Sequence, residues 1–231
     1  MFEHIRENLE RINECIQTAA EKAGCGREDI TLVAVSKTHP VEAIQAAVRY
    51  GVRNIGESRV QEAESKIKAL GSTARWHMVG HLQTNKARKA IEIFDLIQSV
   101  DSRELAEEIN HRAAQIGKKM ECLIEINSSG EKSKYGVDPD SAIGLIENVM
   151  KKENIVLQGL MTIGPLTGDK LLIRKAFRST RELFDRGRMI AGQSFSILSM
   201  GMSADFEMAI EEGSNMIRVG TAIFGQREYR S

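Results

Sequence analysis

The sequence predicts an α/β protein that folds as a single (β/α)8 barrel of the TIM type, with residues 1–231 forming one domain. Eight short apolar runs alternate with amphipathic stretches of roughly 10–20 residues, which is typical of βα units around a parallel sheet. An extra amphipathic segment precedes the first run, and little chain follows the last. The pattern leaves one structural alternative open, a doubly wound open sheet in which one or two strands are misassigned.

The apolar runs set the expected strands, because buried parallel strands read as near-continuous runs of aliphatic and β-branched residues. We expect the single tryptophan, Trp76, in the core. The eight expected strands are Ile30–Ser36, Arg53–Gly56, Trp76–Gly80, Leu96–Val100, Cys122–Asn127, Leu157–Ile163, Phe195–Met200 and Met216–Ile223.

The N-terminal segment is expected to form an amphipathic helix that takes the place of the missing eighth barrel helix. Its apolar stripe comprises Ile5, Leu9, Ile12, Ile16 and Ala20.

Two later helices have recognisable starts. A capping-box pattern at 101–104 opens one helix, and Gly117 ends it. Asp138-Pro139 opens another as an N-cap followed by proline at the first helical position. The residues expected to face inward are Leu105, Ile109, Ala113 and Ile116 in the first helix, and Ile143, Ile146 and Met150 in the second.

The composition excludes several classes of protein. Lys+Arg and Asp+Glu both number 32, so nothing in the formal net charge of +0 favours a nucleic acid or an anionic membrane as partner. The N-terminus lacks the apolar core of a signal peptide, and no apolar run is long enough to span a bilayer. The scattered Cys15, Cys25 and Cys122 suit reduced thiols. We therefore expect a soluble cytoplasmic protein without a metal site.

The first strand delivers a lysine, Lys37, at its C-terminal end in the sequence ITLVAVSKTHP. In a barrel, the loops after the strands build the active site, and partial desolvation there favours a neutral amine that can attack a carbonyl. This is the chemistry of a Schiff-base lysine. Taken alone, the segment favours a lysine that snorkels from a strand end to solvent.

The last two strand ends are expected to form a phosphate site. Ser199–Asp205 follows one strand, with Ser203 as the expected N-cap of the next helix, and the last strand ends at Gly220 and Thr221. Barrels frequently seat phosphate between these two loops, through orphan N–H groups and hydroxyls. The alternative is that Ser203 only caps its helix and Gly220 only relieves crowding.

Other polar residues have less specific interpretations. Arg218, inside the last strand, is expected to face the barrel mouth and meet a phosphate, a carboxylate or a heterocyclic nitrogen, unless it points outward between strands and helices. His77 and His81 lack the helical spacing of a zinc pair, so we expect His77 to stack or hydrogen-bond. Glu57 and Arg59 are expected to organise their loop.

Seven motifs in order resemble the pyridoxal phosphate homeostasis proteins, also called the YggS-like or proline synthetase co-transcribed family, which resembles the barrel domain of alanine racemase. The resemblance covers nearly the whole chain and implies a fold-type III pyridoxal phosphate barrel without the C-terminal β-domain of the racemases. The motifs are LVAVSKTHP, NIGESRVQE, WHMVGHLQTNK, EKSKYGV, GLMTIGP, LSMGMSADFEMAI and IRVGTAIFG.

The resemblance implies pyridoxal 5'-phosphate as cofactor and Lys37 as the residue of its internal aldimine. It places Arg218 against the pyridine nitrogen and Lys134 near the substrate or cofactor. Ser58 stands where the family usually has asparagine, so a shorter hydroxyl replaces an amide there. The residues implied for the phosphate and its loop are Ser199, Gly201, Ser203, Gly220 and Thr221.

The chemistry of these residues favours a carrier over an efficient enzyme. A guanidinium cannot usefully protonate a ring nitrogen, so the pyridine is a poor electron sink. Racemisation needs a second acid/base group. The three tyrosines do not suit that role, because Tyr50 is expected at a helix end, Tyr135 in a loop and Tyr229 in the C-terminal tail. We therefore expect a protein that holds pyridoxal phosphate and delivers it, with apo-enzymes among the recipients, thereby affecting amino-acid and keto-acid pools. We expect a monomer, because the sequence shows no long exposed apolar patch and the resemblance implies no β-domain for the racemase dimer contact. The alternatives are a weak pyridoxal phosphate-dependent racemase and, more remotely, a cofactor-free Schiff-base lyase.

Overall fold

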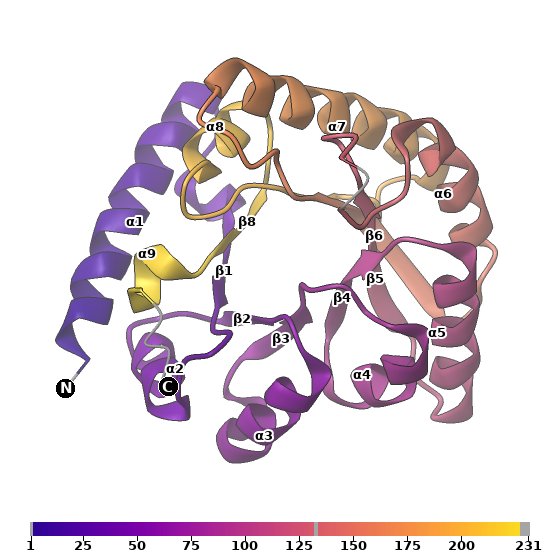
Figure 1. Cartoon of the computed structure of the whole chain (residues 1–231), viewed down its shortest axis with the longest axis horizontal. Coiled ribbons are helices and arrows are strands. Elements are labelled where there is room, and N and C mark those ends of the chain that lie inside the picture. Colours follow the sequence, from indigo (N-terminus) through magenta and orange to yellow (C-terminus); the bar gives the residue numbers. More distant parts are fainter. Residues whose placement is uncertain (1, 132–133, 227–231) are drawn as a thin grey trace.

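A computed structural model describes residues 2–131 and 134–226. Eight parallel strands follow one another around a closed barrel, and the last pairs with the first, so the open-sheet alternative is wrong (Figure 1). The strands are β1 (Thr31–Val35), β2 (Asn54–Glu57), β3 (Arg75–Met78), β4 (Leu96–Val100), β5 (Met120–Ile126), β6 (Ile155–Thr162), β7 (Ile197–Ser199) and β8 (Met216–Val219).

Helices surround the barrel on its outer side (Figure 1). The α-helices are α1 (Glu3–Ala23), α2 (Val41–Arg49), α3 (Val60–Leu70), α4 (Ala87–Ile93), α5 (Arg103–Gln115), α6 (Ala142–Met150), α7 (Lys170–Ala191), α8 (Phe206–Glu211) and α9 (Thr221–Phe224). Short 3₁₀ turns lie at Arg27–Asp29, Gly71–Thr73, Thr84–Lys86 and Pro139–Ser141.

Alternation along the strands creates two apolar regions. One face of each strand packs on the helices in a large outer core, which includes Trp76 as expected. The other face fills the barrel interior, where five apolar residues form a smaller cluster. Polar residues complete that interior toward the carboxyl ends of the strands, which is where a barrel builds its site. The interior apolar residues are Val33, Leu96, Leu123, Met161 and Met216.

Helix α1 packs against α2 on one side and α8 on the other, the place expected for a helix after β8. All five residues of its predicted stripe are buried. Asn8 also donates a hydrogen bond of 2.9 Å to the carbonyl of Ile223, which ties α1 to the short α9. The prediction for the N-terminal helix is therefore confirmed.

Some local predictions are wrong. Strand β8 ends at Val219, because the chain turns at Gly220 into α9 and does not continue to Ile223. Ile116 and Met150 are 52% and 44% exposed, since each lies at the end of its helix, where the stripe has turned away from the core. Ser102 caps α5 by accepting a bond from the Leu105 N–H, so the capping box expected over 101–104 does not form. Asp138 is an N-cap followed by Pro139 as predicted, but of a 3₁₀ turn that leads into α6.

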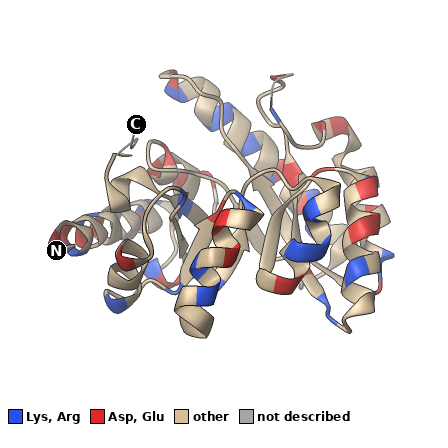
Figure 2. Ribbon diagram, turned by 60° about the horizontal axis from the view of Figure 1, so that its bottom comes forward, with Lys and Arg blue, Asp and Glu red and all other residues tan. Residues whose placement is uncertain are grey.

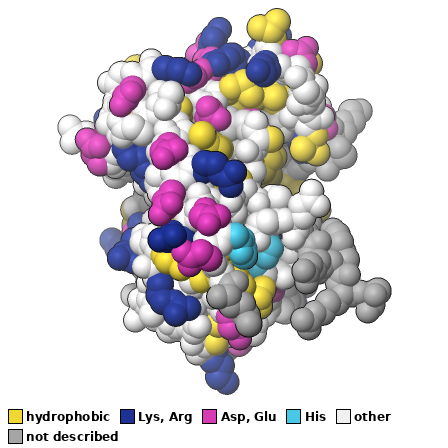
Figure 3. Space-filling model, turned by 90° about the vertical axis from the view of Figure 1, so that its left-hand side faces the viewer, with side chains coloured by type: hydrophobic (Ala, Val, Ile, Leu, Met, Phe, Trp, Pro, Cys, Tyr) yellow, Lys and Arg dark blue, Asp and Glu magenta, His cyan; other side chains and the backbone are white. Residues whose placement is uncertain are grey.

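Charged residues lie mainly on the helices and loops around the barrel, whereas the strands are largely uncharged (Figure 2). On the side that carries α1, basic and acidic side chains are interspersed, as the balanced composition predicts (Figure 3). Within the described ranges, no helix combines the length and the apolar character needed to cross a membrane.

Candidate functional site

A cavity of about 420 Å³ opens at the carboxyl ends of the strands. It brings together six of the residues singled out from the sequence, namely Lys37, Ser58, Ser203, Arg218, Gly220 and Thr221. The remaining lining residues are mostly apolar or small: Val35, His39, Val79, Gly80, Ile163, Met202 and Ala204. A mostly apolar cavity with a few convergent polar groups is typical of a small-molecule site.

Lys37 lies in a tight turn directly after β1. The N–H of Ser36 donates to the carbonyl of Gly56 at 3.0 Å, and the N–H of His39 closes the turn by donating to the carbonyl of Ser36 at 3.0 Å. Thr38 has a φ of 69°, a left-handed conformation that a β-branched residue rarely adopts. Such a backbone persists only where its surroundings hold it.

A second lysine, Lys66 of α3, lies beside this turn and was not predicted from the sequence. It is 5% exposed, and its Nζ donates to the carbonyl of Ser36 at 2.8 Å, to Glu57 Oε1 at 2.6 Å and to Glu62 Oε1 at 2.7 Å. The partners of Glu57 are therefore Lys66 and the hydroxyl of Ser36, which donates at 2.5 Å. The carbonyl of Arg59 accepts a hydrogen bond from an N–H group in the first turn of α3. The spacing of Glu62 and Lys66, four residues apart on a helix, was a usable signal.

The late loops meet as predicted but with different capping. Ser203 Oγ accepts hydrogen bonds from the N–H groups of Gly220 and Ala222, both at 3.3 Å. The prediction that Ser203 caps the following helix is wrong, because α8 begins only at Phe206 and Asp205 Oδ1 accepts from the Met202 N–H at the turn before it. Ser203 thus joins the β7 loop to the β8 loop at the cavity wall.

Gly201 does not line the cavity, but its backbone shapes the same loop. Its φ is 97°, and a Cβ there would lie 2.6 Å from the Cβ of Ala209 and 2.9 Å from the Cα of Phe206. Its carbonyl accepts from the N–H of Arg218 at 3.0 Å. Glycine is therefore required where this loop crosses α8 beside β8.

Arg218 lies inside the barrel, as expected, and is 4% exposed. Its Nη1 donates to Ser199 Oγ and its Nη2 to the carbonyl of Thr162, both at 2.7 Å. Burial lowers the pKa of Arg218 to about 10, against the opposing effect of the Glu125 and Asp205 carboxylates. Ser199 therefore orients Arg218 from the barrel interior and does not itself line the cavity.

The hydrogen bond from Arg218 begins a polar chain through the barrel interior: Arg218, Ser199, Gln98, His77 and Asn54. Ser199 donates to Gln98 Oε1 at 2.7 Å, Gln98 Nε2 lies 2.9 Å from His77 Nδ1, and His77 Nε2 lies 3.2 Å from Asn54 Oδ1. Burial lowers the pKa of His77 to about 3, so the ring is neutral, with Nδ1 accepting and Nε2 donating. His77 hydrogen-bonds, as predicted, and Gln98 was missed.

Glu125, on β5, is a further buried acid near Arg218. It is 4% exposed, and its Oε2 has no hydrogen-bond partner among the described residues. Burial raises the pKa of Glu125 to about 7, reinforced by Asp101 and opposed by Arg218. The carboxyl is thus part of the electrostatic environment of the guanidinium.

Loops from neighbouring strands pack over the same end of the barrel. Lys134 Nζ donates to the carbonyl of Gly164 at 3.1 Å and pairs with Glu131 at 2.7 Å. The rings of His81 and Tyr135 stack with centroids 3.7 Å apart, and His81 Nδ1 lies 3.3 Å from Asp101 Oδ2. Lys134 therefore contacts the loop after β6 and is not among the residues that line the cavity.

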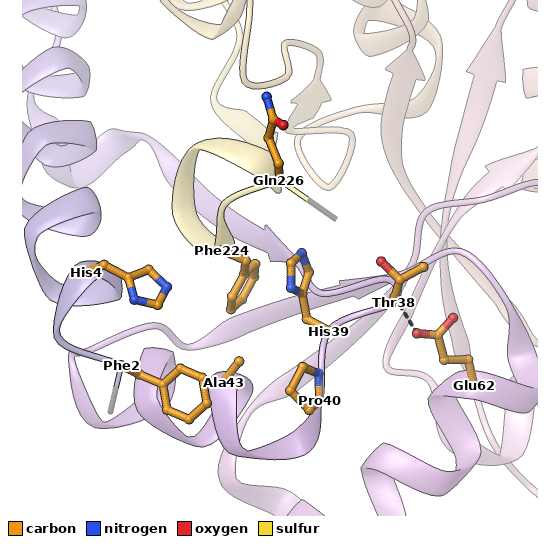
Figure 4. Close-up of a pocket in the computed structure, with 9 residues that line it drawn as sticks. All are labelled: Phe2, His4, Thr38, His39, Pro40, Ala43, Glu62, Phe224 and Gln226. Carbon is orange, nitrogen blue, oxygen red and sulfur yellow. Dashed lines mark hydrogen bonds between the residues drawn. The ribbon is translucent and has the colours of Figure 1, made fainter. Parts of the chain in front are cut away.

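A second cavity of about 590 Å³ lies on the other side of the Lys37 turn. Figure 4 shows Phe2, His4 and Phe224 around it, with Thr38 and Glu62 joined by a hydrogen bond at one side. His39 stacks on Phe224 with centroids 5.0 Å apart and borders both cavities. The turn that carries Lys37 thus separates the two cavities.

Among the described residues, no group of three or more His, Cys, Asp or Glu side chains could hold a metal ion. What the first cavity offers is a primary amine at Lys37, a guanidinium at Arg218, and hydroxyl and N–H donors from Ser203, Gly220 and Thr221. This set suits a small anionic molecule that carries a carbonyl group.

The fold and this cavity define the class of the protein, a closed parallel barrel with a lysine at the end of β1. Comparison with known sequences agrees, since the family model described as alanine racemase, N-terminal domain, matches residues 3–228. The chain belongs to this family and, within it, to the pyridoxal phosphate homeostasis proteins. The pyridoxal phosphate homeostasis protein of Aquifex aeolicus is 42% identical over 224 residues, covering 96% of this chain and 98% of that protein.

Solved structures give the same result. A crystal structure of an unknown protein from Bifidobacterium adolescentis has 39% identity and a TM-score of 0.91, covering 96% of this chain and 95% of that one. PipY of Synechococcus elongatus, in a structure with pyridoxal phosphate bound, has 34% identity and a TM-score of 0.82, covering 96% of this chain and all of that one.

Proposed function

We propose that this protein binds pyridoxal 5'-phosphate, holds it as a Schiff base on Lys37 and serves its homeostasis by capture and delivery. The observation that carries the proposal is the meeting of Lys37, Arg218 and the Ser203–Gly220 contact in one cavity. The cofactor supplies an aldehyde that condenses reversibly with an amine, and a phosphate that needs several donors. The relatives named for pyridoxal phosphate homeostasis, and PipY with the cofactor bound, support cofactor binding and homeostasis as the function.

The anchoring amine is assigned to Lys37 because Lys66 suits a different role. Lys66 directs its Nζ at three oxygen acceptors within 2.8 Å, which matches the three donors of an ammonium group. Lys37 lines the cavity, whereas Lys66 does not. The nucleophile of the site is therefore Lys37.

The phosphate is assigned to the other end of the cavity. The hydroxyl of Ser203 accepts from the N–H groups of Gly220 and Ala222, so these donors converge on one point of the wall. Thr221 adds a hydroxyl beside them. An anionic oxygen bound beside this contact would receive charge-assisted hydrogen bonds from the hydroxyls of Ser203 and Thr221, since both N–H groups already donate to Ser203 Oγ.

Arg218 limits the chemistry to binding and release. Its pKa of about 10 leaves the guanidinium protonated at neutral pH, so it can donate a hydrogen bond to a ring nitrogen but not readily give up its proton. A ring nitrogen that stays unprotonated is a poor electron sink. We therefore propose a carrier that releases the cofactor by hydrolysis or by exchange with another amine. We further propose that it acts as a monomer, that apo-enzymes are among the recipients, and that delivery affects amino-acid and keto-acid pools.

The test is the visible absorption spectrum of the purified protein with added pyridoxal phosphate, before and after borohydride, with peptide mapping of the reduced adduct. The proposal predicts an absorption band that borohydride fixes onto Lys37, and Lys37→Ala is expected to abolish it while circular dichroism shows an intact fold. An adduct on Lys66, or a Lys37→Ala protein with an unchanged spectrum, contradicts the assignment. Sustained D/L interconversion of an amino acid contradicts the carrier function.

A further inference from the structure

We infer that Lys66 is a positioning residue for Lys37: its ammonium group, with Glu57 and Glu62, fixes the turn that presents Lys37 to the cavity. The inference rests on the proposed function, since Lys37 is its anchoring residue.

The contacts enclose Lys37 from both sides along the chain. On the N-terminal side, the carbonyl of Ser36 accepts from Lys66 Nζ at 2.8 Å, and the hydroxyl of Ser36 donates to Glu57 Oε1 at 2.5 Å. On the C-terminal side, the N–H of Thr38 donates to Glu62 Oε1 at 2.6 Å, the bond drawn in Figure 4. The same Lys66 Nζ contacts both carboxylates. One ammonium group therefore joins the two residues that flank Lys37.

The backbone of the turn needs such support. Thr38, at φ 69°, is the only described residue other than glycine with a positive φ. A β-branched residue there is strained, and Glu62 holds its N–H in place. Since Lys66 also holds Glu62, loss of the ammonium group is expected to release Thr38 toward a more favourable conformation and to move Lys37 with it.

Charge explains why a lysine occupies this buried position. Glu57 is fully buried, and burial raises its pKa in spite of Lys66 and Ser36. For Glu62, burial would raise the pKa, but hydrogen bonds from Lys66 and from the Thr38 N–H outweigh it and lower the pKa. Two carboxyl groups thus share one cation. An apolar residue at position 66 would leave the two carboxyl groups buried without a cation. Removing one partner of a buried ion cluster destabilises the fold more than replacing the whole cluster by apolar residues.

The test compares Lys66→Met with Lys68→Met and Leu70→Val on the same helix. Lys68 is exposed, so its variant controls for loss of a charge, and buried Leu70 controls for a general weakening of α3. Two quantities are measured: hydrogen exchange of the Thr38 amide in the cofactor-free protein, and the dissociation constant for pyridoxal phosphate. A positioning role predicts that only Lys66→Met speeds the exchange and weakens binding, each about tenfold or more.

A second variant keeps the test decisive if Lys66→Met does not fold. Glu62→Ala removes the acceptor of the Thr38 N–H at a partly exposed position, and it is expected to produce the same two changes. The inference is overturned if Thr38 exchange and cofactor affinity stay at wild-type values in these variants, or if Leu70→Val reproduces both changes at an equal loss of Tm.

The two readouts separate this inference from the proposed function. Exchange at Thr38 needs no cofactor, so a response there without any borohydride adduct on Lys37 in the wild type leaves the positioning role standing and refutes the proposed function. A wild-type adduct on Lys37 together with unchanged Thr38 exchange in Lys66→Met supports the proposed function and refutes the positioning role.

Discussion

The hydroxyl of Ser199 lies 2.7 Å from Arg218 Nη1 and, on its other side, 2.7 Å from Gln98 Oε1. Arg218 donates to it and it donates to Gln98, so one buried hydroxyl sets both the position of the guanidinium and the direction of the polar chain behind it. Ser199 and Arg218 come from β7 and β8, and Gln98 comes from β4 on the opposite wall of the barrel. This polar chain of hydrogen-bonded side chains thereby connects the cavity to the centre of the barrel.

Ser199→Ala is expected to weaken both stability and cofactor binding. It leaves Arg218 Nη1 and Gln98 Oε1 with one partner fewer in a buried setting, at a cost of about 1–3 kcal/mol for each group left unsatisfied. The measurements are urea unfolding and the dissociation constant for pyridoxal phosphate. The control is Ser99→Ala, because Ser99 on β4 is also fully buried but its Oγ has no hydrogen-bond partner among the described residues. Equal losses in the two variants would show that the polar chain does not matter.

Ser203→Ala is expected to lower cofactor affinity without removing the reaction at Lys37. Its hydroxyl lines the cavity and accepts from the N–H groups of Gly220 and Ala222, so in the proposed phosphate site the variant loses one hydroxyl donor. Each charge-assisted hydrogen bond contributes about 1.5–3 kcal/mol, and Thr221→Val is expected to act similarly. Equilibrium dialysis measures the affinity. Ser102→Ala, which removes the cap of α5, is expected to lower Tm but leave affinity unchanged. If Ser203→Ala and Thr221→Val both bind as tightly as the wild type, the phosphate lies elsewhere.

Periodicity and strand-end position were enough to predict the barrel, the role of α1 and five residues that line the cavity, namely Lys37, Ser203, Arg218, Gly220 and Thr221, whereas Ser58 followed from the family resemblance. They work because the barrel brings every strand end to one mouth, so residues far apart in sequence, such as Lys37 and Arg218, meet there. The extent of β8 could not be predicted, because Thr-Ala-Ile-Phe suits a strand as well as a helix. The chain turns at Gly220, where a Cβ would lie 3.1 Å from the carbonyl oxygen of Val35.

The supporting residues were harder to predict. Lys66 and Gln98 lie within ordinary helix and strand patterns, where a lysine reads as exposed and a glutamine as a surface residue. Their roles depend on partners brought close by the closed barrel: Gln98 meets Ser199 across 101 positions of sequence. Burial of a polar group and the identity of its partner are tertiary properties, so a one-dimensional pattern does not contain them.

Glu125→Gln is expected to stabilise the protein at alkaline pH. The pKa of Glu125 is about 7 in the folded protein, against 4.5 for an ordinary glutamate. Between these values the folded state binds the extra proton, so the free energy of unfolding falls as pH rises through this window and levels off above it. The difference corresponds to about 3 kcal/mol. Glutamine does not titrate, so its advantage in Tm is expected to be small near pH 4.5 and largest above pH 7.

Thermal unfolding from pH 4.5 to 8.5 measures this effect. Exposed Glu153 provides the control, and Glu153→Gln is expected to give a curve parallel to that of the wild type. A Glu125→Gln curve that is also parallel would show that Glu125 is ionised across the whole range, with a pKa held down by Arg218.

Gly201→Ala tests whether the geometry of the β7 loop positions Arg218. At φ 97° an alanine is strained by about 1–3 kcal/mol, and its Cβ would in addition lie 2.6 Å from the Cβ of Ala209, so the loop has to move. The carbonyl of Gly201 accepts from the Arg218 N–H at 3.0 Å, so this movement displaces β8 where it carries the guanidinium. We expect a lower Tm and weaker pyridoxal phosphate binding. Gly168→Ala is the matched control, because Gly168 has nothing within 4 Å of its Cβ position. If Gly201→Ala lowers Tm but keeps wild-type affinity, the loop supports the fold and not the site.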